Sequence, residues 1–128
     1  LRYSMTSALV AVVYSKHFSD DPSDTDATLA AEWAAGQLHY SLGDNPQRRS
    51  YIIGYSGAKG DLAYPRRPHH RGASCPASSD GECTNANMCD PCDSPWVLYG
   101  ALVGGPDETD CWNDDRANWE KNEVALDY

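Results

Sequence analysis

The sequence predicts an all-α fold, and three observations support this prediction. Two segments in the first third of the chain place apolar residues at helical spacing, and a third helical segment follows near residue 114. Between them, residues 56–95 are rich in Gly, Pro, Ser, Asp and Cys and show little periodicity. Three helices and one long Cys-rich loop make a thin core, because a helix layer needs a second layer to cover it. We therefore expect these 128 residues to form part of a larger helical domain.

The first helix is predicted from about residue 1 to residue 17. Its apolar residues form one stripe, made of Leu1, Met5, Ala8, Leu9, Val12 and Val13. No capping residue stands ahead of this helix, as we expect if it belongs to a larger domain.

An acidic link over residues 19–26 leads into the second helix, predicted from about residue 27 to residue 41. The link offers several side chains that cap helix N-termini, namely Ser23, Asp24, Thr25 and Asp26. The apolar residues of this helix point to more than one side, so we expect neighbours on two sides; they are Leu29, Trp33, Ala34, Leu38 and Tyr40. The run Gly43-Asp44-Asn45-Pro46 ends the helix. Two such helices with a short link predict an αα-hairpin.

The remaining chain holds less regular structure. Residues 50–55 are β-prone, and residues 96–103 form a short apolar run that Gly104-Gly105-Pro106 closes. Forty residues without a helix or strand exceed what an ordinary small domain carries, and such loops commonly serve a binding face. The last helix is predicted to begin near Asp114 or Asp115 and to continue through Tyr128.

Composition argues against several classes of protein. The chain carries 10 Lys and Arg against 19 Asp and Glu, a net charge of −9, so it should repel nucleic-acid phosphates and anionic membranes. No run of apolar residues is long enough to span a bilayer. The 4 Trp and 8 Tyr suit a core, and equally the flat faces of sugars.

Five cysteines, an odd number, fall within one third of the chain: Cys75, Cys83, Cys89, Cys92 and Cys111. Their polar, loop-like surroundings favour disulfides in a secreted protein. The most plausible pairs draw on the first four of them, which leaves Cys111 for a partner elsewhere or for none. The alternative is a zinc site, in which Cys89-Asp-Pro-Cys92 and the two preceding cysteines supply four thiolates.

Two motifs carry candidate chemistry. Pro68-His69-His70-Arg71 brings two imidazoles and a guanidinium together, and both groups donate hydrogen bonds to hydroxyls; a solvated basic loop is the plain alternative. Asp114 and Asp115 would sit at a helix start, where the helix dipole favours carboxylates. On the predicted helix Glu123 would share a face with Trp119 and Leu126. That apolar face would desolvate Glu123, as a general acid requires; the alternative is a surface glutamate beside Lys121.

Together these motifs give the chain a specific resemblance to glycoside hydrolase family nine, mostly endo-β-1,4-glucanases or cellulases. The matching stretches are Leu1-Arg2-Tyr3, Leu42-Gly43-Asp44-Asn45-Pro46, Pro68-His69-His70-Arg71-Gly72, Leu98 to Glu108, Asp114-Asp115-Arg116 and Asn122 to Tyr128. They cover nearly the whole chain. The resemblance implies an (α/α)₆ barrel, of which residues 1–128 would be the C-terminal part of the catalytic domain.

The resemblance also implies roles for individual residues. Glu123 would be the proton donor, and Asp114 would orient or polarise the catalytic centre. His69 and Arg71 would bind glucosyl hydroxyls beside the scissile bond, and Tyr128 would line the cleft as a sugar contact. The family inverts the anomeric carbon, which needs a second carboxylate as base. The resemblance places that base in an Asp-Ala-Gly-Asp-type motif that this sequence lacks, so we expect an inactive fragment.

Three readings therefore remain at this point. The first is a portion of a secreted endoglucanase that acts on cellulose or a related β-glucan, with no cofactor and no metal among the residues matched here, and with the N-terminal half of its domain missing. The second is a non-catalytic carbohydrate-binding protein. The third is a small secreted Cys-rich module that binds a metal.

Overall fold

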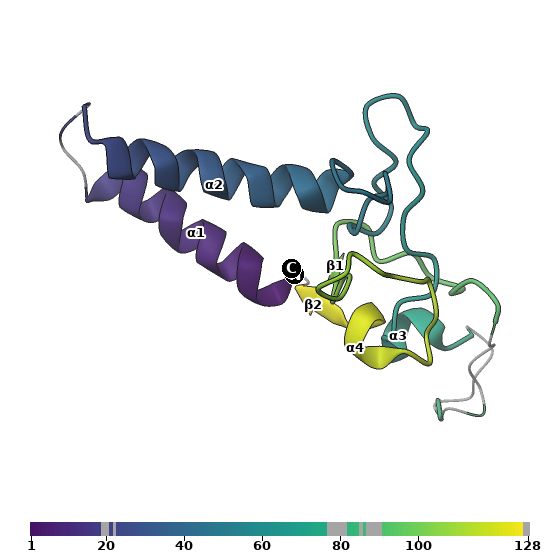
Figure 1. Ribbon diagram of the computed structural model, residues 1–128. Helices are drawn as coiled ribbons and strands as arrows, with labels where there is room; N and C mark the ends of the chain where they lie inside the picture. Colours follow the sequence, from purple (N-terminus) through teal and green to yellow (C-terminus); the bar gives the residue numbers. More distant parts are fainter. Residues whose placement is uncertain (19–20, 22, 77–81, 85, 87–90, 127–128) are drawn as a thin grey trace.

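A computed structural model describes residues 1–18, 21, 23–76, 82–84, 86 and 91–126. Its elements follow one another as α1 (Arg2–His17), α2 (Thr25–Leu42), α3 (Arg71–Ser74), β1 (Leu102–Val103), α4 (Trp119–Asn122) and β2 (Val124–Leu126). In Figure 1 the two long helices lie side by side and project from a smaller body that holds all the other elements. No helix within the described ranges is long and apolar enough to cross a membrane.

The predicted αα-hairpin is confirmed. Asp24 caps α2, because its Oδ1 accepts hydrogen bonds from the backbone N–H groups of Asp26, at 2.9 Å, and Ala27, at 3.1 Å. Gly43 ends α2 with a φ of +125°, a conformation that suits glycine.

The hairpin packs through small residues and leaves large apolar side chains exposed. Its buried apolar residues are Ala8, Ala27 and Ala34. The side chains of Leu9, Val10 and Leu29 are 64%, 64% and 56% exposed. The predicted stripe of the first helix is therefore only partly covered within this chain.

The hydrophobic core lies where the hairpin meets the smaller body. It consists of Tyr51, Ile53, Ala101, Leu102, Val103 and Trp112. The β-prone run at 50–55 contributes to it through backbone bonds rather than as a full strand: the N–H of Ile53 donates to Ala101 O at 2.9 Å, and the N–H of Val103 donates to Tyr51 O at 3.2 Å. On its other side β1 pairs antiparallel with β2.

The prediction of a helix from residue 114 to residue 128 is wrong. Only four residues form α4, and Glu123 leaves the helix with ψ at +139°. The described residues after it pair with β1, with Val103 opposite Val124. Helical spacing is a weak preference, and this pairing with a buried strand overrides it.

The all-α prediction therefore needs correction to a mostly helical chain that also carries a two-stranded sheet. The long loop is also less bare than expected, since it contains α3.

Candidate functional site

The site forms where three distant segments meet at the backbone of Glu123. His69 and Glu123 form a parallel bridge, and the N–H of His69 donates to Asn122 O at 2.7 Å. The N–H of Gly104 donates to Glu123 O at 2.9 Å. A Cβ at Gly104 would lie 2.2 Å from Glu120 O, so only glycine lets the backbones approach this closely.

The Glu123 carboxylate faces a cavity of about 400 Å³. The cavity is lined by Leu1, Arg2, Tyr3, Gly104, Trp119, Glu120, Glu123 and Ala125. Arg2 Nη2 donates to Glu123 Oε2 at 3.4 Å, and the Glu123 side chain is 48% exposed. The sequence predicted a desolvated carboxylate on a helix face. In this chain the Glu123 carboxylate is instead half-exposed and paired with a cation.

Two exposed aromatic rings border the same cavity. Tyr3 is 83% exposed and Trp119 is 55% exposed. Large rings with a polar handle can stack on flat hydroxylated ligands. The sequence analysis predicted no individual role for Arg2 or Tyr3. The contact of Arg2 with Glu123 spans 121 positions and leaves no local pattern in the sequence.

The neighbouring histidines have different surroundings. His69 is exposed, and its Nδ1 lies 2.9 Å from Arg116 O. A backbone carbonyl only accepts hydrogen bonds, so Nδ1 carries the proton and Nε2 remains to bind a ligand. The Nδ1 of His70 instead accepts from the N–H of Ala73 at 3.2 Å and caps α3.

Asp114 supports the histidine segment rather than a helix start. Its two carboxylate oxygens accept from the backbone N–H groups of Arg66, at 2.7 Å, and Arg67, at 3.0 Å. The turn just ahead of His69 is therefore held by this carboxylate. Asp115 accepts from the N–H of Ala117 at 2.9 Å in a local turn.

The remaining predicted sugar contacts are Arg71 and Tyr128. Arg71 is exposed at the start of α3. Among the described residues, the lining of the Glu123 cavity includes neither Arg71 nor His69. Tyr128 lies outside the described residues.

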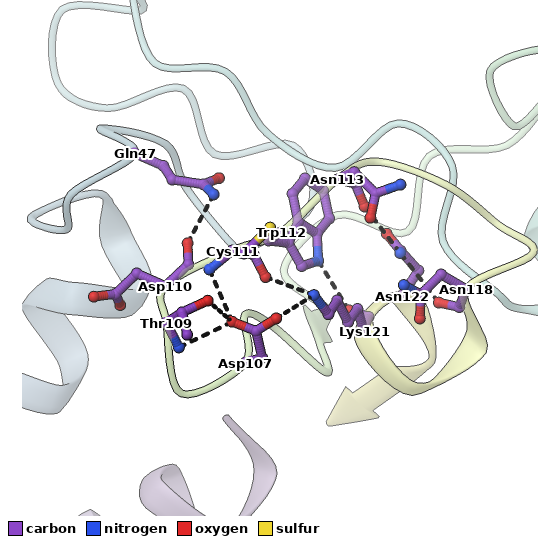
Figure 2. Close-up of polar contacts among 10 residues, drawn as sticks. All are labelled: Gln47, Asp107, Thr109, Asp110, Cys111, Trp112, Asn113, Asn118, Lys121 and Asn122. Carbon is purple, nitrogen blue, oxygen red and sulfur yellow. Dashed lines mark hydrogen bonds and ion pairs between the residues drawn. The ribbon is translucent and has the colours of Figure 1, made fainter.

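Lys121, two positions before Glu123 in the sequence, forms a salt bridge with Asp107, with Nζ and Oδ2 2.7 Å apart (Figure 2). The hydrogen bond from Lys121 is the main reason why the pKa of Asp107 lies well below its usual range, and bonds from Thr109 and Cys111 add to the effect. The same bond raises the pKa of Lys121. No motif in the sequence distinguishes Lys121 and Asp107 from other charged residues.

The cysteines follow the disulfide prediction as far as they are described. Cys75 and Cys83 form a disulfide, and Cys92 is also disulfide-bonded. Cys111 is a free, exposed thiol, and Cys89 lies outside the described residues. The disulfide removes two of the four thiolates of the alternative zinc site. In the part of the chain that is described, no three His, Cys, Asp or Glu side chains are grouped so as to hold a metal ion.

Comparison with known proteins identifies the family. Residues 1–128 match glycosyl hydrolase family 9, so the chain belongs to this family. It is 39% identical over 128 residues to Endoglucanase A of Bacillus pumilus, covering 100% of this chain and 17% of that protein. It is 37% identical over 141 residues to Endoglucanase 5 of Arabidopsis thaliana, covering 98% of this chain and 22% of that protein.

Solved structures agree. The chain resembles endoglucanase CelQ from Clostridium thermocellum complexed with cellotetraose, with a TM-score of 0.75 and 35% identity over 94% of this chain and 18% of that one. The chain is thus homologous to endoglucanases over its full length, and mostly helical like the part of the barrel it matches. It spans a small part of each relative, 17% and 18% in two Bacillus enzymes.

Proposed function

We propose that this chain is the C-terminal, acid-bearing portion of a catalytic domain that hydrolyses internal β-1,4-glucosidic bonds in cellulose or related β-glucans. The observation that carries the proposal is Glu123, whose carboxylate pairs with Arg2 and which lines the same cavity as the exposed Trp119. The family membership supports the same reading.

The proposed mechanism inverts the anomeric carbon. Glu123 donates a proton to the leaving glycosidic oxygen, while a second carboxylate activates a water on the opposite face of the sugar. The two carboxyl groups of an inverting enzyme are roughly 6.5–9.5 Å apart. We assign this base to a segment other than residues 1–128, since the expected aspartate motif is absent from them. Arg2 orients the side chain of Glu123 through its hydrogen bond to Oε2. His69 offers Nε2 to a sugar hydroxyl, and Trp119 offers a stacking face.

We also propose that the protein is secreted. Disulfides persist in oxidising compartments, so the Cys75–Cys83 bond supports a secreted protein.

The test is Glu123→Gln in the longer enzyme that we propose contains this chain. On a β-glucan, kcat should fall by roughly 10²–10⁴, the usual contribution of a general acid. An aryl cellobioside with a good leaving group needs little protonation and should lose much less. Glu120→Gln is the matched control, because Glu120 borders the same cavity and carries the same charge.

Two results would contradict the proposal. Equal losses on both substrates would show that Glu123 is structural. Unchanged hydrolysis with weakened binding of cello-oligosaccharides would favour a carbohydrate-binding role for this region instead.

A further inference from the structure

The ammonium group of Lys121 is bound by two protein oxygens. Lys121 stands two positions before Glu123, in the last turn of α4. Its Nζ donates to Asp107 Oδ2 at 2.7 Å and to Cys111 O at 2.8 Å. The side chains of Lys121 and Asp107 are 20% and 32% exposed, so this pair is largely covered, unlike an ordinary surface pair.

Asp107 also organises the loop that receives Lys121. Its Oδ1 accepts from the N–H of Thr109 at 3.0 Å, from the hydroxyl of Thr109 at 2.7 Å and from the N–H of Cys111 at 3.0 Å. Figure 2 shows these bonds converging on one carboxylate, with the ammonium of Lys121 on its other side. These bonds fix the conformation of the loop 107–111 and leave Asp107 Oδ2 as the acceptor for the ammonium group of Lys121.

The same loop is anchored to the helical hairpin. The hydroxyl of Tyr40, on α2, donates to the Asp110 carboxylate. Gln47 Nε2, just after α2, donates to Asp110 O at 2.8 Å (Figure 2). The hairpin also carries Arg2, which contacts Glu123. The loop thus connects α4 to the hairpin, whose other helix, α1, carries the partner of Glu123.

The backbone carbonyl of Lys121 is also bound, by two donors outside α4. It accepts from Trp112 Nε1 at 3.0 Å and from the N–H of Gly105 at 2.9 Å. A helix of four residues is far too short to be stable alone. The position of α4, and of Glu123 at its end, therefore depends on such bonds.

We propose that Lys121 is a positioning residue, which fixes the carboxylate of Glu123 in the cavity by clamping α4 to the loop 107–111. The proposal rests on the proposed function, because it gives Lys121 a role only through the acid. Lys121 itself does not touch the site: its ammonium has two protein acceptors, and the described residues that line the Glu123 cavity do not include it.

The test is Lys121→Met in the longer enzyme, which keeps the length of the side chain and removes its charge. A small displacement of a catalytic group can cost about 10²-fold, so we expect kcat on a β-glucan to fall roughly 10- to 100-fold with KM little changed. An aryl cellobioside with a good leaving group should lose less than about threefold, because protonation matters little there. Lys121→Arg should restore most of the activity. Lys59→Met, an exposed lysine far from Glu123 in sequence, is the control.

Combining the change with the acid variant separates the two proposals. If Lys121 acts through Glu123, the double variant Lys121→Met with Glu123→Gln should hydrolyse β-glucan no more slowly than Glu123→Gln alone. Additional loss in the double variant, equal losses on the two substrates, or no loss at all in Lys121→Met would each overturn the positioning role. A Glu123→Gln variant without any dependence on the leaving group would instead overturn the proposed function.

Folding of the variants is checked by thermal unfolding. If Lys121→Met does not fold, Asp107→Asn provides the second variant, because the amide retains an acceptor for Lys121 while the charge is lost. The same selective loss on β-glucan is expected for it, in smaller degree; equal losses on both substrates would again contradict the proposal.

Discussion

The two adjacent histidines show how neighbouring residues with the same side chain take different tasks. Arg116 O fixes the tautomer of His69 and leaves its Nε2 available, whereas Nδ1 of His70 is occupied by the N–H of Ala73. The resemblance assigned the sugar contact to His69 from its place after Pro68. His69 is exposed whereas His70 is partly buried at the N-cap of α3, which supports the same choice.

In the longer enzyme, His69→Ala should lower kcat/KM on cello-oligosaccharides about tenfold, the loss expected for a hydrogen bond of about 1.4 kcal/mol. His70→Ala should leave kcat/KM nearly unchanged and lower the Tm, because losing a helix cap costs about 0.5–2 kcal/mol. Steady-state kinetics and calorimetry on both variants check this. If His70→Ala proves the more damaging change for kcat/KM, the assignment within the pair is wrong.

The sequence did not predict the contacts that the candidate site residues make. Glu123 was expected on a helix face with Trp119 and Leu126, but its backbone forms a parallel bridge with His69. Asp114 was expected to cap a helix, yet its carboxylate holds the N–H groups of Arg66 and Arg67. A side chain of this kind satisfies any free backbone N–H nearby, and only the fold decides which one.

At the scale of elements, local signals worked where the structure is local. The αα-hairpin depends on a cap at Asp24 and a stop at Gly43, and both were legible in the sequence. The prediction of a helix after Asp114 failed because the partners that fix this segment are distant in the sequence. Asn122 is fully buried, its backbone O accepts from the N–H of His69 at 2.7 Å, and β1 pairs with the chain after Glu123. No window of neighbouring residues contains those partners.

The loop 107–111 should be the element most sensitive to acid. The pKa of Asp107 is depressed in the folded chain, chiefly by the hydrogen bond from Lys121. A depressed carboxyl group stabilises the fold above its unfolded pKa, about 3.9, and that contribution is lost as pH falls toward the folded value. The raised pKa of Lys121 keeps the partner charged up to its ordinary value of about 10.4.

The chain should therefore have a higher Tm than its Asp107→Asn variant between about pH 5 and pH 9, with the difference shrinking as pH falls below about 4. Thermal unfolding over this range measures it. Asp61→Asn, at an exposed aspartate, is the control and should show a small difference at every pH. A difference for Asp107→Asn that stays constant from pH 6 down to pH 2 would contradict the role given to the carboxylate.

At the scale of the whole molecule, the chain divides into a projecting hairpin and a body that carries the site (Figure 1). The core lies at their junction, so the outer part of the hairpin has little cover: Phe18 is 76% exposed and Trp33 is 44% exposed. The sequence predicts neighbours on two sides of α2, and this stays a prediction; among the described residues of α2, Leu29, Trp33 and Leu38 are exposed. The chain spans 17% of Endoglucanase A of Bacillus pumilus, so most of that protein's length has no counterpart in it.

The 128-residue chain alone should accordingly release no reducing sugar from soluble carboxymethyl-cellulose. Inversion requires an acid and a base placed on opposite faces of the sugar, and only the acid is assigned here. Cavity and acid remain, so weak binding of cello-oligosaccharides by the chain is compatible with this expectation, whereas turnover is not. The measurement compares the purified chain with its Glu123→Gln variant, after circular dichroism has shown that both fold alike. Sugar release by the chain that the variant lacks would mean that a carboxylate within residues 1–128 serves as the base, and the division of the catalytic pair proposed above would have to be abandoned.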